Sequence, residues 1–61
     1  MTVSLADQVK CAGRELGMRR GVYPKFVQSG RMKQDEADRE IERMAAILET
    51  LKALQEKEAG A

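Results

Sequence analysis

The sequence predicts an all-α fold: an antiparallel helical hairpin whose two long helices are joined by a short bridging helix. Two observations predict it. Apolar residues recur every three or four positions in two separate stretches, which is the spacing of a helix with one buried face. Between these stretches lie Pro24 and Gly30, residue types that interrupt helices and turn the chain. The 61 residues are expected to form one small domain, 1–61, with a frayed tail over 58–61.

A first long helix is expected over residues 5–21. Ser4 precedes it as a suitable N-cap, because its hydroxyl can accept a hydrogen bond from the backbone N–H of Asp7. The apolar positions that follow are four, three and four residues apart: Leu5, Val9, Ala12 and Leu16. This spacing places them on one face, which should pack against the second long helix.

Three glycines at intervals of four residues weaken this first helix: Gly13, Gly17 and Gly21. Their shared stripe has two interpretations. The glycines are either tolerated in a marginal helix or form a smooth face that another backbone can approach closely.

A short bridging helix is expected over residues 24–29. Proline disfavours the helical conformation of the residue before it, so the first helix should end near Tyr23. Pro24 itself suits the first turn of a new helix, because its missing N–H is not needed there. Gly30 then follows as a suitable left-handed residue that ends the short helix.

The second long helix is expected over residues 34–57, which contain neither glycine nor proline. Its apolar stripe follows the same spacing: Ala37, Ile41, Met44, Leu48 and Leu51. Ile47 and Leu54 widen the stripe beyond what one partner helix covers. The candidate dimer or partner interface therefore has five members: Met44, Ile47, Leu48, Leu51 and Leu54.

Self-association would help so short a chain. A single core of this size supplies only ~3–5 kcal/mol, and small domains add disulfides, metals or partners. Cys11 is the single cysteine and the sequence has no histidine, so neither an internal disulfide nor a zinc site is expected. We therefore expect a homodimer. The alternative is a monomeric hairpin whose exposed stripe binds another protein.

Charge divides the chain into a basic front and an acidic back. Residues 10–33 carry seven bases and one acid, a net charge of +6, and residues 34–61 carry eight acids and four bases, a net charge of −4. In an antiparallel hairpin Arg19 and Arg20 should lie near the acidic start of the second long helix. That start contains Asp35, Glu36 and Asp38. Much of the charge is therefore expected to be neutralised within the chain.

The basic bend around residues 14–33 is a candidate binding site in its own right. Its candidate partner-binding residues are Arg19, Arg20, Tyr23, Lys25 and Arg31. Arginines beside aromatic rings can hold phosphates and stack a base, so nucleic acid is the alternative partner. The acidic second long helix and the sequence pI of about 7.9 argue against it, because both weaken the attraction of a phosphate backbone. A protein partner is favoured.

Enzymatic activity, a cofactor, a metal site and a small-molecule substrate are not expected. Without histidine the chain lacks the usual general base near neutral pH and any Ser-His or Cys-His pair. The acids lie on solvated helix faces, and no phosphate-binding glycine loop is present. The N-terminal residues do not resemble a signal peptide, and no stretch approaches a membrane span, so a cytoplasmic location is expected.

One stretch of the sequence has a recognisable pattern. It runs Glu15-Leu-Gly-Met-Arg-Arg-Gly-Val-Tyr-Pro-Lys-Phe-Val-Gln-Ser-Gly-Arg-Met and continues with Ala37-Asp-Arg-Glu-Ile and Met44-Ala-Ala-Ile. Across residues 15–47 it resembles a group of short uncharacterised proteins encoded by phages and prophages of proteobacteria. The resemblance implies a phage or prophage context and the cytoplasm of a bacterial host, and it implies no particular chemistry. Small helical proteins in that context act as adaptors or inhibitors of host proteins, which is the function we expect.

Overall fold

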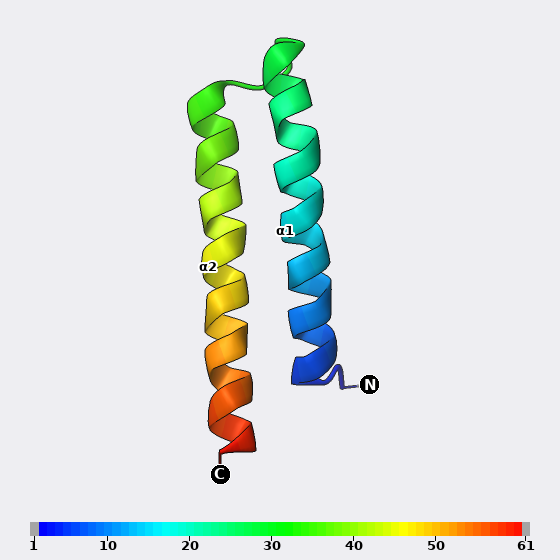
Figure 1. Cartoon of the computed structure of the whole chain (residues 1–61), viewed down its shortest axis with the longest axis vertical. Coiled ribbons are helices and arrows are strands. Elements are labelled where there is room, and N and C mark those ends of the chain that lie inside the picture. Colours follow the sequence, from blue (N-terminus) through cyan, green and yellow to red (C-terminus); the bar gives the residue numbers. More distant parts are fainter. Residues whose placement is uncertain (1, 61) are drawn as a thin grey trace.

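The structure, a computed structural model, describes residues 2–60 and consists of two α-helices that pack against each other as a hairpin (Figure 1). Helix α1 spans Leu5–Gln28 and helix α2 spans Gln34–Ala59. The helices run antiparallel, so both chain ends lie at the same end of the molecule and the connecting loop lies at the other (Figure 1). The predicted all-α hairpin is confirmed, and residues 2–60 contain no strand.

Helix α1 begins where the sequence predicts. Ser4 has an extended backbone, and its hydroxyl oxygen accepts a hydrogen bond of 3.1 Å from the backbone N–H of Asp7. One of the four N–H groups that a helix leaves without an internal partner is thereby satisfied. The Asp7 carboxylate also lies in the first turn, where the positive end of the helix dipole favours a negative charge.

Helix α1 continues through Pro24 to Gln28. The predicted end of the first helix at residue 21 is therefore wrong, and so is the predicted separate helix over residues 24–29. A proline inside a helix leaves the carbonyl four residues earlier without its hydrogen bond. That carbonyl belongs to Arg20, and both residues are exposed, so water can replace the lost donor. Beyond the proline, Phe26 and Val27 are half-buried. Their burial favours continuing the helix.

The chain turns at Gly30, as predicted. Gly30 has a φ of 81°, and the hydrogen bonds around it close a Schellman motif: its N–H donates to the Val27 carbonyl at 3.1 Å, and the Arg31 N–H donates to the Phe26 carbonyl at 2.9 Å. The Arg31 guanidinium lies over the Phe26 ring, 6.0 Å from its centroid. A glycine is needed here because a Cβ strains this left-handed conformation.

Helix α2 begins after Lys33, which has no side-chain hydrogen bond to cap the helix. Asp35 and Glu36 lie in the first turn and stabilise it through the helix dipole. The helix ends at Ala59, two residues beyond its predicted end at 57. Of the predicted tail, residue 61 lies outside the described residues.

The core is a thin apolar layer between the two helices. Buried side chains come from both: Ala12, Leu16, Ala37, Met44 and Leu48. Half-buried apolar residues pack against the cluster: Val9, Ile41, Ala45 and Leu51. The molecule measures 47 × 21 × 16 Å, so two helices on one layer of contacts leave most side chains near the surface.

Candidate protein-interaction face

Arg19 connects the two helices on one side of the hairpin. Its Nε donates to the Glu15 carboxylate of α1 at 3.0 Å, and its Nη1 donates to the backbone carbonyl of Glu40 in α2 at 3.0 Å. The Glu40 carboxylate in turn accepts from Arg43 at 2.7 Å. Glu15 and Glu40 therefore mark the edges of α1 and α2 that lie on the same side of the molecule.

Exposed apolar residues gather on that same side. In α1, Met18 and Val22 follow Glu15 by three and seven residues. In α2, Ile47 and Leu54 follow Glu40 by seven and fourteen residues. Residues at these intervals lie on nearly the same face of a helix. We call these four residues the apolar face: Met18, Val22, Ile47 and Leu54. Met18 is 57% exposed and Ile47 is 50% exposed. Large apolar side chains that are exposed on one side of a protein mark a candidate interaction surface.

An open groove of about 600 Å³ adjoins the apolar face near the N-terminal half of α1. Its lining comes mostly from α1: Val3, Asp7, Gln8, Cys11, Ala12, Glu15 and Met44. Ala12 and Met44 are buried and form the apolar floor of the groove, whereas Cys11, which also lines the groove, is exposed. Because Glu15 lines the groove, the groove opens on the same side as the apolar face.

The predicted interface of α2 divides into two groups. Met44 and Leu48 are each only 8% exposed, and Leu51 is half-buried against the core cluster, so the hairpin itself uses these three. Ile47 and Leu54 are 50% and 49% exposed. Only these two of the five predicted residues remain available to a partner of the hairpin.

The predicted ion pairs of Arg19 with Asp35, Glu36 and Asp38 are wrong, since its acidic partners are Glu15 and Glu40. The reason is the length of α1. Arg19 lies nine residues before the helix end instead of two, so it faces α2 further along. The hydrogen bond to Glu15 raises the pKa of the Arg19 guanidinium above its usual value, so Arg19 remains a cation.

The aromatic residues of the bend are engaged within the chain. The Tyr23 and Phe26 rings stack with centroids 6.3 Å apart and planes inclined by 27°. The Arg19 guanidinium lies 5.9 Å from the Tyr23 centroid, and Arg31 lies over Phe26. Each ring thus already has an arginine over one face. Of the other residues predicted at this site, Arg20 and Lys25 are exposed.

The α1 half of the apolar face and the groove were not predicted. A signal was present, because Cys11, Met18 and Val22 are separated by seven and four residues and form a second apolar stripe on the first helix. The groove has no sequence signal of its own. It forms between residues that come together only when the helices pack.

The chain matches no protein-family model, no curated protein and no solved structure. Within residues 2–60, neither helix is long and apolar enough to cross a membrane. The same residues bring together no group of three or more histidine, cysteine, aspartate or glutamate side chains that could hold a metal ion.

Proposed function

We propose that this chain is a protein–protein interaction module whose apolar face binds a second copy of the chain, so that two hairpins form a four-helix homodimer. The observation that carries this proposal is the exposed surface of the hairpin, 4867 Å². A compact monomer of 6.8 kDa exposes about 3,950 Å². The excess of about 900 Å² reflects the elongated shape of the hairpin, 47 × 21 × 16 Å, and leaves room for a standard interface, in which each partner buries roughly 800 Å².

A second copy suits the apolar face in shape and in charge. A twofold interface places the same patch on both sides, so an apolar stripe meets an apolar stripe. Four charges on this side of the hairpin pair with one another and sum to zero: Glu15, Arg19, Glu40 and Arg43. These four charges would therefore not make two copies repel each other. Antiparallel helices also stack readily into four-helix bundles.

The resemblance to phage and prophage proteins supports a setting for this module. In the cytoplasm of a bacterial host, the dimer would act as an adaptor or inhibitor that binds a host protein. Its exposed outer helix faces would remain available for that second contact. Self-association is assigned to the apolar face, to which α2 contributes Ile47 and Leu54.

Cys11 offers a direct test, because it is exposed and lines the groove beside the apolar face. If a second copy covers this side, the Cys11 thiol reacts more slowly with a bulky thiol reagent as protein concentration rises. Ile47→Glu should restore fast reaction at every concentration, since it places a charge in the apolar contact. Ala46→Glu is the matched control. Ala46 is the exposed neighbour of Ile47 and lies off the apolar face, so its variant should behave like the parent.

A reaction rate that does not depend on protein concentration, and that Ile47→Glu leaves unchanged, would contradict the second copy as the occupant of this face.

A further inference from the structure

We propose that the outer side of α1 is a second binding surface, which holds the phosphate backbone of a nucleic acid without reading its sequence. The surface consists of three cations, Lys10, Arg14 and Lys25, which we call the basic row. It shares Arg14 and Lys25 with the bend around residues 14–33, adds Lys10, and leaves out Arg19, which is bound within the hairpin. The basic row borders the apolar face, because Met18 follows Arg14 by four residues and precedes Lys25 by seven. The inference does not rest on the homodimer, since it is argued from the exposed cations alone.

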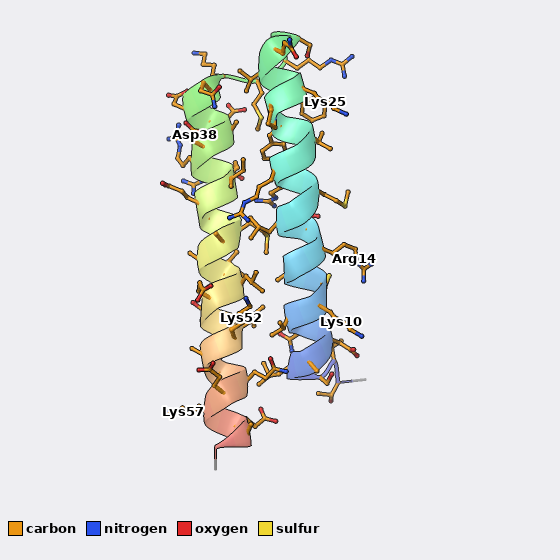
Figure 2. All side chains as sticks on the ribbon, in the orientation of Figure 1. Lys10, Arg14, Lys25, Asp38, Lys52 and Lys57 are labelled. Carbon is orange, nitrogen blue, oxygen red and sulfur yellow. The ribbon has the colours of Figure 1, made fainter. Side chains whose placement is uncertain are left out.

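The three cations share one face of one continuous helix. Arg14 follows Lys10 by four residues and Lys25 follows Arg14 by eleven, and both intervals return to nearly the same direction around a helix. Figure 2 shows all three on the side of α1 that faces away from α2. At 1.5 Å per residue the row is about 22 Å long. This alignment exists only because α1 continues through Pro24.

The cations of the basic row are available to a ligand. All three are exposed, and none forms a salt bridge with a carboxylate of residues 2–60, whereas Arg19, Arg39 and Arg43 do. Helix α1 has only two acids. Glu15 is held by Arg19 on the side of the apolar face, and Asp7 lies at the N-terminal end of the row. The acids of α2 lie across the hairpin from the row.

A nucleic acid fits this surface better than a membrane does. A duplex carries one negative charge per about 1.7 Å of its axis, so a straight row of cations finds a phosphate near each of its members. A helix that binds a bilayer surface instead needs apolar side chains to insert beside its cations. Between Arg14 and Lys25, Gly17 and Gly21 have no side chain to insert, and Met18 is the one exposed large apolar side chain beside the row. One such side chain gives a bilayer little apolar surface to hold.

The test is the salt dependence of binding to a labelled duplex of mixed sequence, followed by fluorescence anisotropy from about 50 mM salt upward. Three phosphate contacts per chain predict a slope of log K against log salt of about −2.7. Lys25→Gln and Arg14→Gln should each reduce the slope by about 0.9, because each removes one contact. Asp7→Asn should strengthen binding, since it removes the acid beside the row.

Lys57→Gln is the matched control, because Lys57 is an exposed cation of α2 and its loss changes the net charge equally. It should leave the slope unchanged. If Lys57→Gln reduces the slope of log K against log salt as much as Lys25→Gln does, the basic row is overturned, since binding would then follow net charge alone. Absence of binding at the lowest salt would also overturn it. Binding to phosphatidylserine vesicles without binding to the duplex would overturn the nucleic acid in favour of a membrane surface.

Discussion

Arg19 is a single side chain on which the packing of the two helices depends. It is half-buried, it donates to Glu15 within α1, and it donates to the Glu40 carbonyl across the hairpin. We expect Arg19→Gln to lower the free energy of unfolding by about 1–2 kcal/mol, because hydrogen bonds of a charged donor are lost. Urea denaturation measures the change.

Arg20 provides the control for that experiment. It is the next residue, it is exposed, and it forms no salt bridge with a carboxylate of the described chain. Arg20→Gln should therefore change the free energy of unfolding by no more than about 0.5 kcal/mol. Equal effects of the two substitutions would show that Arg19 does not hold the helices together.

Gly30 and Gly21 should respond to substitution with opposite signs. Gly30 has a φ of 81°, so Gly30→Val should lower the free energy of unfolding by at least about 1 kcal/mol. Gly21 lies in the helix, and a Cβ added there meets nothing within 4 Å. Gly21→Ala should therefore raise stability by up to about 1 kcal/mol, because alanine favours the helix. Thermal melting of both variants tests the pair, and a shift in the same direction for both would refute the assignment.

At the scale of the elements, Pro24 distinguishes a continuous α1 from two separate helices. In a continuous helix, Pro24→Ala restores a donor for the Arg20 carbonyl and removes the steric conflict of the ring. We expect an increase in stability of about 1 kcal/mol or more, measured by urea denaturation with the helical circular dichroism signal retained. If residue 24 instead began a new helix, proline would be favourable there, and the same substitution would be neutral or destabilising.

The elements also show which features can be predicted from sequence. Ser4 and Gly30 were predicted correctly, because a cap and a left-handed turn depend on the chemistry of a few adjacent residues. Pro24 was not. Its local penalty is outweighed where Phe26 and Val27 are half-buried, and that burial depends on how the two helices pack rather than on the residues next to Pro24.

The candidate site could be predicted only in part for the same reason. The wide apolar stripe of α2 is visible in the sequence, and the exposure of Ile47 and Leu54 agrees with its excess width. The sequence does not show how α2 is rotated about its own axis relative to α1. This rotation determines which residues of the stripe are buried, and it buries Met44 and Leu48. The partners of Arg19 depended on the length of α1, so the error at Pro24 also misplaced them.

At the scale of the whole molecule, the hairpin has little core for its length. Five hydrophobic residues are buried, and among the described residues no large side chain is fully enclosed. Burial of apolar surface is the main favourable term in folding, so a thin layer of it leaves a 61-residue chain only marginally stable. Binding of a second copy would add stability that rises with protein concentration.

Sedimentation equilibrium over a hundredfold range of protein concentration tests the homodimer most directly, when it is combined with melting curves at the same concentrations. The proposal predicts a mass approaching twice the 6.8 kDa of one chain at high concentration, with a melting temperature that rises with concentration. Ile47→Glu should sediment as a single chain, and Ala46→Glu should sediment like the parent. A mass of 6.8 kDa throughout, with a constant melting temperature, would contradict self-association through the apolar face.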